Sequence, residues 1–228
     1  MLQVNDLTVF RGPKIVLDQV TFTLGDGQKA GLVGVNGSGK TTLLKTVMGL
    51  LQPEEGEVRK PQRVGYLPQD VTLDIGFPLD GTVGEYVLSA LEDYQRLSRG
   101  MRRSLSQMAE ASDDALPVIM ARYGRLEAEF SRRGYYVAQS RAERLLAHLG
   151  LQGVDLDREM RTLSGGQKTR LALTRLLLSE PDLLLLDEPT NFLDVDATAW
   201  FMSFIKQYAG TVLIISHDIE LLDQSIDQ

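Results

Sequence analysis

Hydrophobic and polar residues alternate along the first part of the chain. The segments 2–10 and 20–24 alternate with a period of two, as half-buried strands do. A short apolar run at 29–33 leads into the glycine-rich stretch GVNGSGKTT, and 42–51 then places leucines and a valine on one helical face. Gly49 and Pro53 mark the end of that helix. This pattern predicts the order strand, glycine-rich loop, helix.

The last third of the chain carries two uninterrupted apolar runs. Residues 183–186 read LLLL and residues 211–215 read TVLII, while 168–179 has the pattern of a helix that ends before Pro181. Uninterrupted apolar runs are typical of parallel strands that are covered on both faces. The predicted fold class is therefore α/β, and ligands in such folds bind at the carboxyl ends of the strands.

The region between these parts has helical periodicity. Apolar residues spaced by three or four predict one face of a long helix; they are Val87, Leu91, Tyr94, Leu97, Met101, Leu105 and Met108. A second helix is predicted from Asp113 to Phe130 and a third near 139–149, with a kink of the first helix at Gly100. The first two helices predict an antiparallel hairpin that projects about 25–40 Å.

Composition excludes several kinds of protein. The chain has no cysteine and only two histidines, which rules out disulfides, cysteine-ligated metal sites and multi-histidine metal sites. No apolar run approaches the roughly 20 residues that span a bilayer, so we expect a cytoplasmic protein without membrane insertion. We read His148, near the end of the third helix, as a residue without chemistry.

Charge is distributed unevenly along the sequence. The net charge of −7 argues against broad affinity for nucleic acid. Four arginines nevertheless fall within eight residues that contain no acidic residue; they are Arg96, Arg99, Arg102 and Arg103. They form either a local RNA-binding patch or an ordinary solvated helix face.

The glycine-rich stretch matches the phosphate-loop pattern, Gly34-x-x-x-x-Gly39-Lys40-Thr41, between a predicted strand and a predicted helix. Glycines allow consecutive backbone N–H groups to surround an anion at a helix N-terminus. Lys40 can reach the β- and γ-phosphates of a nucleotide, and the Thr41 hydroxyl can ligate Mg²⁺.

Acidic residues follow the first uninterrupted apolar run. Asp187 could hold Mg²⁺, and Glu188 could accept a proton from an attacking water; the alternative is a pair that only caps the next helix. His217 follows the second run and could donate to the γ-phosphate or cap a helix that starts near Ile219.

A second glycine-containing helix start is the most informative oddity of the sequence. Leu163-Ser164-Gly165-Gly166-Gln167 precedes the helix at 168–179 and forms another anion-binding N-terminus. One domain rarely needs two such sites for one nucleotide.

The motifs GVNGSGKTT, YLPQD, LSGGQ, LLLLDEP, NFLD and SHD occur in this order, and the chain resembles an ATP-binding cassette (ABC) ATPase domain across residues 2–223. The resemblance implies that ATP and Mg²⁺ are the cofactors and that a second cassette packs head to tail. It further implies a core with a mixed sheet, an antiparallel β edge and a helical subdomain with an inserted α-hairpin.

The resemblance also implies roles for individual residues. The phosphates would be wrapped by Asn36, Gly37, Ser38, Gly39, Lys40, Thr41 and Thr42. Gln69 would link metal and water to the helical subdomain, Glu188 and His217 would serve hydrolysis, and Phe10 would stack on adenine or else belong to the core. The LSGGQ segment would act on the partner's ATP, and Asp194 would lie at the contact between cassettes.

The 94 residues between Gln69 and Ser164 and the sequence PTNFLD resemble the ABC-F subfamily, whose two-cassette proteins act on ribosomes through an inserted arm. We expect an ATP-binding core at 1–69 and 161–228 and a helical subdomain at 70–160 with an arm at about 84–135 that touches rRNA or tRNA. The sequence, which stops at Gln228, looks like the amino-terminal half of a longer protein.

Two alternatives to this function remain open. The chain could be the ATPase subunit of an ABC transporter, which needs a groove near Gln69 for a helix of a membrane partner. It could also be a nucleotide-gated binding module with little turnover.

Overall fold

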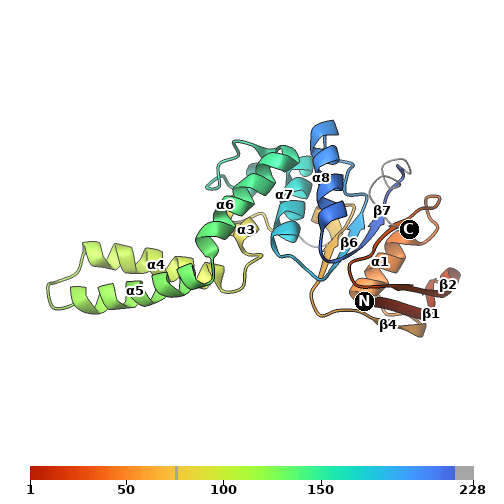
Figure 1. Cartoon of the computed structure of the whole chain (residues 1–228), viewed down its shortest axis with the longest axis horizontal. Helices are drawn as coiled ribbons and strands as arrows, with labels where there is room; N and C mark the ends of the chain where they lie inside the picture. The colour runs from red at the N-terminus through yellow and green to blue at the C-terminus, as the bar shows by residue number, and fades with distance from the viewer. Residues whose placement is uncertain (75–76, 219–228) are drawn as a thin grey trace.

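The centre of the molecule is a parallel sheet of four strands in the order β3-β7-β6-β5. Figure 1 labels the two central strands, β6 and β7. The computed structural model describes residues 1–74 and 77–218 of the chain. The four strands are β3 (Lys29–Leu32), β7 (Thr211–Ile215), β6 (Leu183–Asp187) and β5 (Val64–Leu67). The parallel strands predicted at 183–186 and 211–215 are thus neighbours in the middle of the sheet.

A separate antiparallel sheet has the order β2-β1-β4. It consists of β2 (Lys14–Leu24), β1 (Leu2–Arg11) and β4 (Glu55–Arg59). Gly56 in β4 has a φ of +89°, and a Cβ there would lie 2.5 Å from the carbonyl oxygens of Asn5 and Asp6, so only glycine fits. The α/β class is confirmed, with the parallel and antiparallel strands divided between two sheets.

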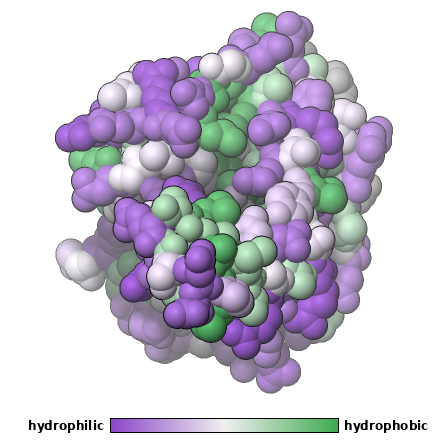
Figure 2. Space-filling model, turned by 90° about the vertical axis from the view of Figure 1, so that its left-hand side faces the viewer, coloured by the Kyte–Doolittle hydropathy of each residue, from purple (hydrophilic) through white to green (hydrophobic). Residues whose placement is uncertain are grey.

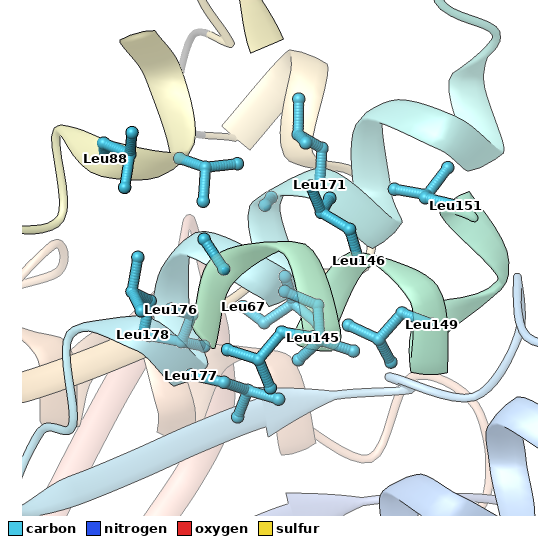
Figure 3. Packing of buried hydrophobic residues seen from close by; sticks show 14 of the residues in the cluster. Leu67, Leu88, Leu145, Leu146, Leu149, Leu151, Leu171, Leu176, Leu177 and Leu178 are labelled. Atoms are coloured by element: carbon cyan, nitrogen blue, oxygen red, sulfur yellow. The ribbon is translucent and has the colours of Figure 1, made fainter. Parts of the chain in front are cut away.

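Both faces of the parallel sheet are covered. Leu184 and Leu186 of β6 pack into a core with the helices α7 (Gly165–Leu178) and α8 (Val195–Gln207). Leu183 and Leu185 face a second core, shared with α1 (Lys40–Met48) and the antiparallel sheet. Figure 3 shows leucines of the first core. Residues 183–186 are all apolar because alternate side chains of β6 enter cores on opposite faces of the sheet, and both faces are buried.

The helix after the glycine-rich loop is shorter than predicted. It ends at Met48, because Gly49 takes a left-handed conformation with φ of +93° and donates its N–H to the carbonyls of Lys45 and Thr46. Leu50, which the pattern placed on the helical face, lies beyond this cap and is exposed.

The long helix predicted over 87–108 is two helices. The first, α3 (Val83–Leu88), begins at a capping box between Thr82 and Glu85. The second, α4 (Tyr94–Ala109), begins after Asp93, whose φ of +59° turns the chain. The prediction was wrong here because Val87 and Leu97 pack into one core from both sides of the break, so apolar spacing continues across it.

The predicted hairpin is formed by α4 and α5 (Leu116–Arg132), which project away from the sheet as an arm (Figure 1). The 16 residues of α4 give it a length of about 24 Å at 1.5 Å per residue. Gly100 lies within α4, where a Cβ would come 3.0 Å from the Leu126 side chain on α5. The α-helix continues through Gly100, so this glycine serves close packing of the hairpin.

An aromatic cluster braces the root of the arm. Phe130 of α5 lies 5.3 Å from Tyr94, 5.2 Å from Tyr135 and 4.8 Å from Tyr136, measured between ring centroids. Tyr135 begins α6 (Tyr135–Leu146), so the cluster joins all three helices. Edge-to-face ring contacts of this kind stabilise a junction beyond their buried area.

The third predicted helix spans α6 and a π-helical turn, η1 (Ala147–Leu151). The remaining elements are α2 (Val71–Asp74) and a 3₁₀ turn, η2 (Met160–Thr162). His148 stacks on Trp200 of α8 with ring centroids 4.6 Å apart. Within residues 1–74 and 77–218, no helix is long and apolar enough to cross a membrane. The helix expected near Ile219 lies outside the described residues.

Candidate functional site: a phosphate-loop cavity

The glycine-rich loop leaves β3 and turns into α1. Gly37 and Gly39 have φ of +80° and +97°, conformations that L side chains rarely adopt. A Cβ at Gly39 would also lie 2.9 Å from the carbonyl oxygen of Val16. The loop therefore needs glycine both for its turn and for its contact with β2.

Lys40 and Thr41 begin α1 at the floor of this loop. The Lys40 ammonium donates to the carbonyls of Gly34 at 2.5 Å and Val35 at 3.1 Å. An ammonium group has three donors, so one remains for an anion held by the loop. The Thr41 hydroxyl donates to Oδ2 of Asp187 at 2.6 Å, which joins the phosphate loop to the end of β6.

Glu188 follows at the point where β6 ends. Its N–H donates to the carbonyl of Ile215 at 3.0 Å, which extends the pairing of β6 with β7 by one residue. Its φ of +51° is unusual for a residue with a side chain. The residue is only 5% exposed. Backbone strain of this kind persists where the surrounding structure enforces it, often at functional sites.

His217 lies beside Glu188. Its Nε2 is 3.0 Å from Oε1 of Glu188, an ion-pair distance when the imidazole is protonated. No donor in the described part of the chain is aligned on this buried Oε1 with hydrogen-bond geometry. The arrangement leaves a carboxylate oxygen able to accept a hydrogen bond from a bound water or ligand.

Burial affects both carboxylates. Desolvation raises the pKa of Asp187, and the hydrogen bond from Thr41 only partly opposes it. Desolvation also raises the pKa of Glu188, against the opposing influence of His217. Each carboxylate therefore binds a proton more readily than an exposed one would.

These groups surround one cavity of about 350 Å³. The sequence-predicted residues that line it are Asn36, Gly37, Gly39, Lys40, Thr41, Thr42, Gln69, Asp187, Glu188 and His217. The structure thus brings together the phosphate loop, the acidic pair, the glutamine after β5 and the histidine after β7. Gly34 and Ser38 belong to the same loop but do not line the cavity.

Val16 also lines the cavity and was missed by the sequence reasoning. It lies in β2 at a register shift: Val9 pairs with Leu17 and Phe10 with Ile15, so Val16 is the extra residue of a bulge. The period-two pattern of a strand gives no signal for such a residue.

Phe10 lies outside the cavity lining. It is in β1, paired with Ile15 and 40% exposed, so it is not part of the core either. Its predicted role as the adenine-stacking residue stays a prediction.

The second glycine-containing segment lies apart from the cavity. Ser164 caps α7: its hydroxyl accepts from the N–H of Gln167, whose side-chain oxygen accepts from the N–H of Ser164. Leu163 is buried, whereas Ser164 and Gly165 are exposed. At Gly166 a Cβ would contact the ring of Phe192 at 3.6 Å. None of these residues lines the phosphate-loop cavity.

Asp194 caps the next helix. Its Oδ1 accepts from the N–H of Ala197 at 2.9 Å, and the residue is exposed. This cap is a structural role that the motif alone did not reveal, and the predicted contact with a second cassette remains a prediction.

The oxygen atoms at the end of β6 suit Mg²⁺. Thr41 Oγ1 and Asp187 Oδ2 are hard oxygen donors 2.6 Å apart, the kind of ligand that Mg²⁺ prefers. The described residues hold no group of three or more His, Cys, Asp or Glu that could bind a metal by themselves. This donor set fits an ion that is held partly by phosphates.

Comparison with known proteins now decides the family. A sequence profile of the ABC transporter family matches residues 17–191, from β2 through the acidic pair. The chain belongs to this family of ABC ATPases. Membership assigns ATP binding and the ATPase class to the cassette.

Relatives of this ABC cassette include proteins of the ABC-F type. The tylosin resistance ATP-binding protein TlrC of Streptomyces fradiae is 40% identical over 98% of this chain and 40% of its own length. ABC transporter F family member 5 of Arabidopsis thaliana is 36% identical over 92% of this chain and 30% of its own length. The resemblance to ABC-F proteins is confirmed, and the cassette spans less than half the length of these relatives.

A solved ABC ATPase shares the fold. The ATP-binding subunit of an ABC transporter superimposes with a TM-score of 0.71 and 23% identity, and the match covers 100% of this chain and 83% of that one. At this identity the match shows the fold alone.

Proposed function

We propose that this cassette hydrolyses ATP within an ABC-F-type translation factor or ribosome-protection protein, and that it closes head to tail with a second cassette around two ATP molecules. One observation carries this proposal. The chain has two glycine-containing helix starts of the kind that bind anions, yet only the phosphate loop lines the cavity; the Ser164–Gln167 segment, whose first two residues are exposed, lies elsewhere. A second nucleotide, held by another cassette, would use that segment.

Binding of ATP is assigned to the phosphate loop. Backbone N–H groups around Gly37 and Gly39 would hold the phosphates, and the free donor of Lys40 would contact the β- and γ-phosphates. The hydroxyl of Thr41 and the carboxylate of Asp187 would hold Mg²⁺. When bound, Mg²⁺ neutralises charge on the phosphates.

Hydrolysis is assigned to Glu188. Its Oε1, which faces His217 but has no donor aligned on it with hydrogen-bond geometry, would accept a hydrogen bond from the attacking water and orient it. His217, 3.0 Å away, would keep Glu188 in place and contact the γ-phosphate, and Gln69, which lines the same cavity, would contact the water. Loss of the γ-phosphate removes contacts shared by two cassettes and so favours opening.

Contact with the ribosome would be made by the arm. The relative TlrC is named for resistance to tylosin, and we extend that role to this chain as a proposal. The arm, within residues 84–135 of a helical subdomain at 70–160, would contact rRNA or tRNA in the cytoplasm, while 1–69 and 161–228 would form the ATP-binding core.

A glutamate substitution tests the proposal. In the protein that carries both cassettes, Glu188→Gln should lower hydrolysis at this site by about 100-fold or more, because a general base contributes that much. With ATP bound and the equivalent glutamate of the second cassette also replaced, the protein should co-sediment with ribosomes.

The matched control is Glu180→Gln, a loop glutamate outside the cavity. It should hydrolyse ATP and leave ribosomes as the wild type does. Unimpaired hydrolysis after Glu188→Gln would refute the assignment of Glu188, and no ribosome association in any nucleotide state would refute the ABC-F role.

A second candidate function rests on a groove. Beside β5 lies a cavity of about 590 Å³ lined by residues that include Leu50, Phe77, Tyr86 and Ala90. The ATPase subunit of a transporter needs such a groove for a helix of its membrane partner. Stable co-purification with a membrane protein, rather than with ribosomes, would favour this function; neither association, with negligible hydrolysis, would favour a nucleotide-gated binding module.

A further inference from the structure

An ion pair joins the phosphate-loop helix to the segment that follows Gln69. Lys45 Nζ of α1 lies 2.6 Å from Oδ1 of Asp74, the last residue of α2. The two side chains are only 18% and 26% exposed. By comparison, the side chains of the Arg63–Asp182 pair are 64% and 47% exposed. Partial burial reduces screening by salt, so the Lys45–Asp74 pair holds its elements together better than a surface pair.

On the α1 side, Lys45 connects the ion pair to Thr41, which would hold Mg²⁺ in the cavity. Lys45 lies four residues after Thr41, on the same face of the helix. The carbonyl of Lys45 also accepts N–H groups from the three residues that follow α1, residues 49–51, which fixes its backbone. The Lys45 ammonium is therefore presented from a rigid support one turn from Thr41.

On the other side, the pair is attached to Gln69. Asp70 follows Gln69 directly, and its Oδ1 accepts from the N–H groups of Thr72 at 2.9 Å and Leu73 at 3.0 Å. This makes the short helix α2 a stiff spacer between Gln69 and Asp74. The chain from Gln69 to Asp74 and the chain from Thr41 to Lys45 are thus two short rigid segments closed by one ion pair.

We propose that Lys45 and Asp74 are positioning residues that hold the side chain of Gln69 at the wall of the nucleotide cavity, at a fixed distance from Thr41 and Asp187. This inference rests on the proposed ATPase function. Neither Lys45 nor Asp74 lines the cavity, whereas Gln69 does, so the pair would act by fixing the residue that faces the nucleotide. Misplacement of a catalytic group by about 1 Å is sufficient to cost up to about 100-fold in rate.

The test uses the protein that carries both cassettes, with Lys45→Met, Asp74→Asn and the charge-swapped double variant Lys45→Asp/Asp74→Lys. Each single variant should lower kcat by about 10-fold or more with KM for ATP changed by less than about twofold, because the phosphate loop stays intact. The swapped variant should recover most of the lost kcat. Arg63→Gln, which breaks an ion pair distant from the cavity, is the matched control and should leave both constants unchanged.

The single variants distinguish positioning from an electrostatic effect, and Tm distinguishes it from a loss of stability. Lys45 lowers the pKa of Asp187 and Asp74 raises it, so a purely electrostatic role would move kcat in opposite directions in the two single variants. A general loss of stability would lower Tm in the single variants. Any recovery in the swapped variant would then appear in Tm as well as in kcat. Unchanged kcat in both single variants, or no recovery in the swapped variant, would overturn the inference.

The failure of this inference is distinct from failure of the proposed function. Wild-type hydrolysis that is abolished by Glu188→Gln but insensitive to the single variants overturns only the positioning role. A wild-type protein that does not hydrolyse ATP overturns the ATPase proposal and the positioning role together.

Discussion

At the scale of single residues, Glu188 combines three unfavourable features: a left-handed backbone, burial and a carboxylate oxygen without an aligned donor. A non-glycine residue in the left-handed region costs about 1 kcal/mol or more, and a buried acceptor that lacks an aligned donor adds to that. Features of this kind are retained where they serve chemistry, so this residue lowers stability in exchange for function.

The pH dependence of stability tests this view. Burial raises the pKa of Glu188 above its ordinary value of 4.5, so between these two pKa values the folded chain binds more protons than the unfolded chain. The contribution of Glu188 to the free energy of unfolding therefore falls as pH rises through that window. Without nucleotide, Glu188→Gln should be more stable than wild type at pH 7, and the difference should shrink toward pH 4.

Urea denaturation at several pH values measures this difference. Glu143→Gln, at an exposed position of α6, is the control and should give a difference that does not vary with pH. A Glu188→Gln variant that is less stable than wild type at pH 7 would contradict the argument.

At the scale of secondary-structure elements, the root of the arm depends on Phe130. Its ring is 4% exposed and contacts rings from α4 and α6. Phe130→Ala should reduce the free energy of unfolding by about 3–5 kcal/mol, because it leaves a cavity among three helices. Met120 on the same helix is 56% exposed, so Met120→Ala should change the free energy of unfolding by less than about 0.5 kcal/mol. Equal losses in the two variants, measured by urea denaturation, would show that the cluster does not brace the arm.

The elements could be predicted wherever one local pattern determines them. The apolar run of β6 indicated a strand covered on both faces, and the hairpin followed from apolar spacing. The break before Tyr94 could not be predicted, since α3 and α4 pack into one core and keep the same spacing. The predicted end of α1 was off by a few residues, because the cap at Gly49 determines where the helix stops.

At the scale of the whole molecule, predictability depends on the distance between residues in the sequence. The phosphate loop and the acidic pair are contiguous motifs whose chemistry requires their residue types, so the sequence indicated them. Val16 enters the cavity through a bulge in β2, and Lys45 meets Asp74 from 29 residues away. Both result from tertiary packing, for which the local pattern contains no signal.

The arginines of the arm differ in whether they form ion pairs. Arg96 pairs with Asp93, and Arg132 pairs with Glu129. Within the described ranges, 1–74 and 77–218, no ion pair involves Arg99 or Arg103, which lie on α4. Figure 2 views the molecule from the side of the arm, where hydrophilic groups surround smaller hydrophobic areas. Cations without acidic partners are the ones available to phosphates.

If the arm contacts RNA as proposed, this division predicts which arginines carry the contact. Each arginine that contacts a phosphate releases counterions, so losing two contacts should reduce the slope of log affinity against log salt by about 1.5. Arg99→Gln/Arg103→Gln should show this reduction in binding of ribosomes or tRNA measured between about 50 and 200 mM salt. Arg96→Gln/Arg132→Gln removes the same charge from arginines that already have partners and should change the slope less. Equal slopes in the two double variants would mean that net charge alone, rather than unpaired arginines, controls the contact.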